Sequence, residues 1–247
     1  MSYHDQDLRK PILPGTAPTD YERYLRTEDL FALQKPAEKM AHPDELTFQV
    51  VHQSSELVMK SVIFDLERVR VWISEGKLGA AARLMRRANE IFQTPIALLH
   101  ILEQITPKDY HVIRAVLGHG SGLDSPGFLG LLHITKPIWE TFEGLLKKSG
   151  VSVVDIYRNP DKNFELHQIA EEMLDFDERL QLFRLHHLKL AERIIGPGVI
   201  GTSGVPVEIL KQRMDHVFFK PLWEVRNQIT ADANAALAEK SQGHGRE

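Results

Sequence analysis

Residues 44–75 read DELTFQVVHQSSELVMKSVIFDLERVRVWISE. Within this stretch, one set of residues recurs at alternating steps of three and four: Phe48, His52, Ser55, Met59, Val62, Leu66, Val69 and Ile73. Side chains at such steps lie on one face of an α-helix. The stretch therefore predicts one amphipathic helix of about 30 residues that lays an apolar stripe against a core.

The same periodicity predicts further helices along the chain. The segments that show it are 78–105, 128–148, 164–195 and 207–240. Pro95, Pro137 and Pro221 fall within three of these segments, and we expect a kink or a break at each because proline lacks a backbone N–H.

Shorter signals mark the connections. Thr106, Pro107 and Asp109 have the residue types of an N-cap, a first helical position and an acidic first turn, so they predict a short helix up to Leu117. Residues 118–126, GHGSGLDSP, hold three glycines and one proline and predict a loop.

Strand-type alternation is absent from almost the whole sequence. The sequence therefore predicts an all-α fold, a single-domain bundle of long helices. Residues 1–20 carry three prolines and no apolar period, so we expect an extended N-terminal arm. The helical domain is expected over 21–240, and a flexible tail over 241–247.

Composition narrows the function classes. The chain has 247 residues, 43% apolar and 26% charged, with a formal net charge of −4, which favours a full core and gives no sign of nucleic acid or membrane binding. Cysteine is absent, so thiolate ligands and nucleophiles are excluded and any metal must bind His, Asp or Glu. The polar start and the lack of a long apolar window predict a cytoplasmic protein.

His187 is the first candidate site residue. It shares the apolar stripe of the predicted 164–195 helix with Met173 and Leu180, whereas His186 lies on a charged stripe. One interpretation is a core histidine bonded to a carbonyl. The other is an axial ligand to a metal or a haem, because imidazole is the strong iron ligand that remains without cysteine.

His52 and Arg114 leave similar alternatives. His52 follows Phe48 by one helical turn, so it is either a structural core histidine or a hydrogen-bonding group beside an aromatic ring. Arg114 lies four residues after Tyr110 and on the same face as Leu117. It is either a surface arginine stacked on tyrosine or a group that grips a carboxylate in two hydrogen bonds.

Residues 196–201 read GPGVIG, the spacing of a dinucleotide-binding fingerprint. A long predicted helix precedes them where that fingerprint needs a strand, so we reject the interpretation. The following Thr202 and Ser203 suit a loop that meets a small anion. Motifs of zinc proteases, P-loop NTPases and serine hydrolases are absent.

Five separated segments share the pattern of one known family. In chain order they are Tyr21–Leu25 (YxxYL), Asp44–Leu57 (DELxFxxxHQxSEL), Tyr110–Arg114 with Ser121-Gly122 (YxxxR and SG), Phe183–Gly196 (FRxxHxxxxERxIG), and Gly201-Thr202 with Leu222–Arg226 (GT and LWxxR). On these segments the sequence resembles the tryptophan 2,3-dioxygenases, haem-dependent enzymes that open the indole ring. The resemblance extends from about Tyr21 to Ile229.

The resemblance implies a role for each matching residue. His187 would be the axial ligand of haem b, whose iron is ferrous in the active state, and His52 would be the catalytic histidine that hydrogen-bonds the indole N–H. The substrate-binding set would be Phe48, His52, Tyr110, Arg114, Leu117, Ser121, Gly122 and Thr202. Arg114 and Thr202 would hold the carboxylate of the amino acid.

The resemblance also implies a homotetramer. Tyr21, Tyr24 and Leu25 would then reach the pocket of a neighbouring subunit. The implied partners are an indole amino acid, O2 and further copies of the chain, without nucleic acid or membrane.

The implied reaction is addition of O2 across the indole C2–C3 bond of L-tryptophan or a close derivative, with a product of the N-formylkynurenine type. Two loops depart from the family pattern: Asp124 stands where the family has Gln, and the GT loop at 201–204 is shortened. These departures suggest the alternative of a haem oxygenase, including a monooxygenase, acting on a modified tryptophan or indole in a biosynthetic pathway. A non-catalytic haem protein is a third reading.

Overall fold

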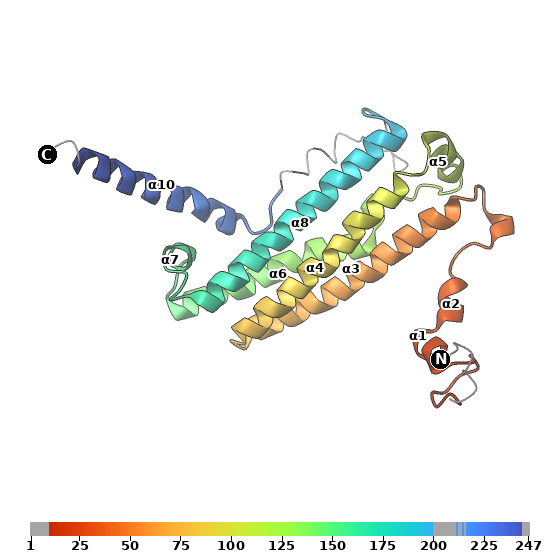
Figure 1. Cartoon of the computed structure of the whole chain (residues 1–247), viewed down its shortest axis with the longest axis horizontal. Coiled ribbons are helices and arrows are strands. Elements are labelled where there is room, and N and C mark those ends of the chain that lie inside the picture. The colour runs from red at the N-terminus through yellow and green to blue at the C-terminus, as the bar shows by residue number, and fades with distance from the viewer. Residues whose placement is uncertain (1–9, 200–210, 212–213, 215, 244–247) are drawn as a thin grey trace, which may run out of the picture.

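The computed structural model describes residues 10–199, 211, 214 and 216–243. Over this part of the chain there are helices and no strand. The body consists of α3 (Glu45–Ser74), α4 (Leu78–Leu102), α6 (Pro126–Ser149) and α8 (Phe164–Ile195). These helices run side by side as an elongated bundle (Figure 1). The predicted all-α class is confirmed.

The order of packing places α3 between two neighbours. It contacts α4 and α6, and α4 contacts α8 on its other side. The shorter elements are α1 (Asp20–Leu25), α2 (Thr27–Phe31), η2 (Ala37–Lys39), α5 (Pro107–Arg114), η3 (Gly122–Asp124) and α7 (Val153–Arg158). The last helix, α10 (Lys220–Gly243), extends away from the bundle (Figure 1).

The predicted break at Pro137 is wrong, because helix α6 continues through it. The predicted interruption near Pro221 is confirmed: residue 211 is helical, residues 216–219 are not, and α10 begins at Lys220 with Pro221 as its second residue. A proline in the first turn costs no intrahelical hydrogen bond because the first N–H groups have no partner in the helix. Within α6 one lost bond is outweighed by the burial of Ile134, Ile138 and Phe142 against the core.

Helix α7 was not predicted. Ser152 accepts a hydrogen bond from the Asp155 N–H while the Asp155 carboxylate accepts one from the Ser152 N–H, which is a capping box that starts this helix. The predicted 107–117 helix ends earlier, at Arg114. Hydrogen-bonded turns follow it, in which the carbonyls of Ile113 and Arg114 are the acceptors.

The core has two clusters, one for each end of the bundle. The larger one includes Leu66, Phe92, Phe142, Phe176 and Phe219, all fully buried. The smaller one surrounds α5 and consists of Val51, Leu99, Leu102, Ile105, Ile113, Leu190 and Ile194. The apolar stripes predicted for 44–75 and 164–195 supply both clusters.

A buried carboxylate fixes the chain after α8. Asp177 is fully buried on α8, and its Oδ2 accepts hydrogen bonds from the N–H groups of Phe218 and Phe219 at 2.9 and 3.1 Å and from Trp223 Nε1 at 3.0 Å. Trp223 belongs to the LWxxR segment, so this motif holds the start of α10 against α8.

The N-terminal segment folds back on its own first helix. The Asp20 carboxylate accepts hydrogen bonds from the N–H groups of Ile12 and Leu13, and the Arg23 guanidinium donates to the carbonyls of Leu13 and Ala17. These bonds lower the pKa of Asp20. In Figure 1, α1 and α2 lie beside the bundle rather than within it. None of the described helices has the length and apolarity to cross a bilayer.

Candidate functional site

A cavity of about 470 Å³ lies between the two core clusters. Its apolar walls include Met59, Leu99, Leu102, Phe128, Phe183 and Phe218. Three histidines also line it: His52 on α3, His187 on α8, and His216. A mostly apolar cavity with a few polar groups is typical of a small-molecule or cofactor site.

His187 presents a neutral imidazole to the cavity. Burial, with a smaller effect of His52, lowers the pKa of His187 from 6.5 to about 4, so the ring is uncharged near neutral pH. The ring lies parallel to Phe183, with centroids 6.3 Å apart and planes 18° apart. Among the described residues it has no hydrogen-bond partner, so it is not a core histidine held by a carbonyl.

Gly122 lies directly against the Nε2 atom of His187. A Cβ added at Gly122 would stand 3.0 Å from Nε2 and 3.4 Å from Cε1. Any other residue at this position would place a side chain where a ligand of Nε2 must come. The backbone of the turn therefore covers Nε2 here, and glycine is the residue that lets it come this close.

His52 also keeps one nitrogen available. Its Nδ1–H donates to the Phe48 carbonyl at 2.7 Å, which leaves the lone pair of a neutral ring on Nε2. Burial lowers the pKa of His52, against the opposing effects of the Phe48 carbonyl and the Glu56 carboxylate. The ring is exposed to the cavity, so His52 can accept a hydrogen bond there and is not a core histidine.

Aromatic rings continue from His52 to α5. The Phe48 ring lies 4.2 Å from the His52 ring and 6.1 Å from the Tyr110 ring. Burial raises the pKa of Tyr110, and the nearby charge of Arg114 opposes this effect. Phe48, Tyr110 and Leu117 pack against the smaller core cluster beside the cavity.

The glycine-containing loop forms a short 3-10 turn. Ser121 accepts from the Leu123 N–H and its own N–H donates to Asp124, a capping box that stabilises η3. Asp124, which stands where the family has Gln, is therefore used within the turn and is exposed. Leu123 lines the cavity in its place.

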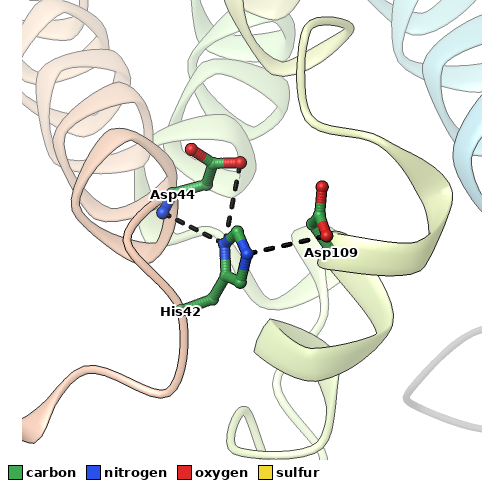
Figure 2. A group of neighbouring side chains, drawn as sticks. All are labelled: His42, Asp44 and Asp109. Carbon is green, nitrogen blue, oxygen red and sulfur yellow. Dashed lines mark hydrogen bonds and ion pairs between the residues drawn. The ribbon is translucent and has the colours of Figure 1, made fainter.

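A cluster of His42, Asp44 and Asp109 connects the starts of α3 and α5 (Figure 2). His42 Nδ1 accepts from the Asp44 N–H at 3.2 Å, and Nε2 lies 3.6 Å from Asp109 Oδ1. A neutral imidazole has one lone pair, and here the Asp44 N–H takes it. The remaining Nε2–H faces Asp109, so we interpret the cluster as a clasp that holds α5, not as a metal site.

The structure brings several of the predicted site residues together. His52, Gly122 and His187 face one cavity, while Phe48, Tyr110 and Arg114 lie beside it on α3 and α5. Ser121 lies in the same turn as Gly122. Thr202 lies outside the described residues. The predicted neighbouring-subunit set, Tyr21, Tyr24 and Leu25, is exposed on α1 and apart from this cavity.

Some lining residues were missed in the sequence. Glu56 lies one turn after His52 and Arg184 one turn before His187, so helical spacing alone was a usable signal for both. His216 and Phe218 come from the segment that Asp177 holds, and no local pattern marks them.

The donor set at the cavity fits a haem. An axial ligand must be a neutral imidazole with a free nitrogen in an apolar site, and His187 meets each condition. The mostly apolar walls agree with a mostly apolar group, and a ligand of Nε2 would take the place where the Gly122 backbone now lies.

Comparisons with known proteins point to one family. The profile of the family described as Tryptophan 2,3-dioxygenase matches residues 12–132. The Tryptophan 2,3-dioxygenase of Bacillus thuringiensis subsp. konkukian (strain 97-27) is 30% identical, over 85% of this chain and 92% of its own. That of Serratia proteamaculans (strain 568) is 27% identical, over 91% of this chain and 100% of its own. With this similarity spread over nearly the whole chain, the protein belongs to the tryptophan 2,3-dioxygenase family.

Proposed function

We propose that the protein is a haem-dependent oxygenase that adds O2 across the indole C2–C3 bond of L-tryptophan or a close derivative and gives a product of the N-formylkynurenine type. One observation carries the proposal. In a chain of this family, two neutral histidines from different helices face one apolar cavity, each with an available nitrogen.

His187 would hold haem b through Nε2. The haem, with ferrous iron, supplies the binding and activation of O2. The apolar walls exclude water, and the turn at Gly122 would withdraw from Nε2 to admit the group.

His52 would orient the indole. Its Nε2 lone pair can accept a hydrogen bond from the indole N–H, and its depressed pKa keeps that lone pair available at neutral pH. The Phe48 ring, which contacts the His52 ring, would pack on the indole. His52 then fixes the substrate without having to remove a proton.

Tyr110 and Arg114 would bind the amino-acid end of the substrate. A guanidinium can grip a carboxylate in two hydrogen bonds, and α5 brings Arg114 close to Tyr110, at the side of the cavity where Phe48 lies. Thr202 would complete the carboxylate site. The chain would act as a homotetramer in which Tyr21, Tyr24 and Leu25 line the pocket of a neighbouring subunit.

A second candidate is a haem oxygenase that inserts oxygen into a modified tryptophan or indole, giving an oxindole or a hydroxylated product. The observation that favours it is Leu123, an apolar residue at the cavity wall in a loop that departs from the family pattern. A non-catalytic haem protein would have no need for the His52 and Phe48 pair.

The test is turnover of L-tryptophan and of its methyl and hydroxy derivatives by the purified, haem-loaded chain under isotopically labelled O2. We expect N-formylkynurenine with two labelled oxygen atoms from L-tryptophan. One labelled oxygen, or clear preference for a derivative by kcat/KM, would favour the second candidate. Haem binding without any turnover would favour the non-catalytic reading.

A further inference from the structure

The Glu56 carboxylate accepts two hydrogen bonds from the loop that faces His187. It lies on α3, one turn after His52, and its side chain lines the cavity. Its Oε1 accepts a hydrogen bond from Ser125 Oγ, and its Oε2 accepts one from the Gly127 N–H at 2.8 Å. Both carboxylate oxygens are therefore used by one segment, 125–127.

The fit between this carboxylate and the loop is close. A Cβ added at Gly127 would lie 2.6 Å from Glu56 Oε2 and 2.9 Å from Met59 Cβ, so only glycine allows the backbone to approach. Ser125 is also the N-cap of α6, because its Oγ accepts from the Phe128 N–H at 3.0 Å. Glu56 thus anchors the first turn of α6 to α3.

The anchored segment continues directly into the turn at His187. Residues 121–124 form a rigid unit through the capping box of Ser121 and Asp124. Gly122 of this unit lies against Nε2 of His187, and Leu123 lines the cavity. One short segment thus connects α3 to His187. Glu56 holds the end of this segment that lies against α3.

The Glu56 charge also acts on His52, where it opposes the lowering of the pKa by burial. Within the described part of the chain it forms no ion pair with a lysine or an arginine. A carboxylate beside an apolar cavity costs free energy unless its hydrogen bonds are satisfied, and here the two donors of the loop satisfy them.

We propose that Glu56 is a positioning residue that fixes the 121–127 segment over the cavity and so sets the space between Gly122, Leu123 and His187. Its effect on turnover rests on the proposed function. Its effect on the loop stands on the contacts with Ser125 and Gly127 alone.

The experiment compares Glu56→Leu, Ser125→Ala and the double variant with the wild-type chain, all full length. The control is Glu140→Gln, an exposed residue of α6 whose pair with Lys136 lies on the surface. Three quantities are measured: amide hydrogen exchange of residues 118–128 before haem is added, the Kd for haemin by absorption titration, and the kcat and KM for L-tryptophan of the haem-loaded chain.

Leucine is of similar size and has no acceptor, so Glu56→Leu loses both bonds. We expect exchange at Gly127 or in the turn to rise about tenfold or more, since tenfold is the range for loss of one hydrogen bond to a charged group. KM should rise by about the same factor with kcat changed less than about twofold, because the loop shapes the binding space and leaves His52 in place. The double variant should cost less than the sum of Glu56→Leu and Ser125→Ala, because both single changes remove the contact between these two side chains.

Unchanged exchange in Glu56→Leu would overturn the anchoring. Faster exchange with unchanged KM and haemin Kd would overturn the positioning role, since the loop would then be held without consequence for the site. A wild-type chain that binds haemin without turnover would refute the proposed oxygenase activity. The haemin Kd of the variants would then test the positioning role of Glu56. A wild-type chain that binds no haemin would overturn the proposed function, and the exchange of residues 118–128 would still decide the anchoring by Glu56.

Discussion

His186 and His187 are adjacent in α8, but their rings meet different surroundings. The His187 ring faces the cavity, whereas the His186 ring makes an edge contact with His100, with centroids 5.1 Å apart. Adjacent residues in a helix point about 100° apart. We therefore expect His187→Ala to lose the Soret absorption of bound haem and His186→Ala to keep it. Equal haem content in both purified variants, with helical circular dichroism intact, would contradict the assignment.

Arg114 allows a test of the carboxylate site. We expect Arg114→Ala, and also Arg114→Lys, to raise KM for L-tryptophan by the equivalent of about 2–5 kcal/mol, because a lysine cannot form the bidentate pair. An indole substrate without a carboxylate should lose little. Arg193→Ala, a surface change on α8, serves as the control. Steady-state kinetics that leave tryptophan turnover intact would show that Arg114 faces elsewhere.

The depressed pKa of His187 predicts a pH dependence of stability in the haem-free chain. The unfolded state takes up a proton near pH 6.5, but the folded state does so only near pH 4. Folding stability is therefore full above pH 6.5 and falls by about 3 kcal/mol as the pH decreases to 4. Chemical unfolding of the wild type and of His187→Gln at several pH values measures this, and the variant should lose less on acidification. Equal losses would refute the link.

At the scale of elements, the clasp between α3 and α5 can be tested through His42. Its contacts are 3.2–3.7 Å long and partly exposed, so His42→Ala should cost roughly 1 kcal/mol or less in the free energy of unfolding. KM for tryptophan should rise several-fold, because Tyr110 follows Asp109 directly in α5. His133→Ala, an exposed change on α6, is the control. A lower unfolding midpoint with unchanged KM would limit the clasp to a structural role.

The elements that the sequence predicted well are the long ones. Helices α3 and α8 appear within one residue of their predicted ends because a buried stripe repeated over many turns is a strong local signal. The wrong break at Pro137 arose from a local rule that tertiary packing overrides.

The candidate site was predictable only where it lies on those helices. The faces of His52 and His187 follow from helical spacing, and Tyr110 and Arg114 follow from their four-residue separation. The inward position of Leu123 and the bonds of Glu56 depend on how a loop lies on a distant helix, which no local pattern contains. The same holds for His216 and Phe218, which are brought to the cavity by a buried aspartate on α8.

At the scale of the whole molecule, the first helix offers a test of assembly. Tyr21 and Tyr24 are 69% and 79% exposed. Exposed aromatic rings on one helix suggest a surface that another subunit covers. We expect light scattering to give the mass of four chains of 28.2 kDa each. Mixed assemblies of Tyr24→Ala and His187→Ala subunits should regain activity, because an intact arm from one subunit can serve an intact haem site of the other.

The control for this mixture combines His187→Ala with Arg114→Ala subunits. In that mixture no site has both a haem ligand and a carboxylate clamp, so activity should stay lost. Recovery in both mixtures, or in neither, would speak against an arm shared between subunits, and a monomeric mass would exclude it.

The close approach of α6 to α3 also constrains how this sequence can diverge. A side chain at Gly127 would collide with the Glu56 carboxylate, and one at Gly130 would lie 2.6 Å from Ile63 Cδ1. A lineage that acquires a side chain at 127 must shorten the residue at 56 or move the helix. Positions 56 and 127, and likewise 63 and 130, should therefore change as pairs among descendants of this gene, leaving a covariation record of the contact between the two helices.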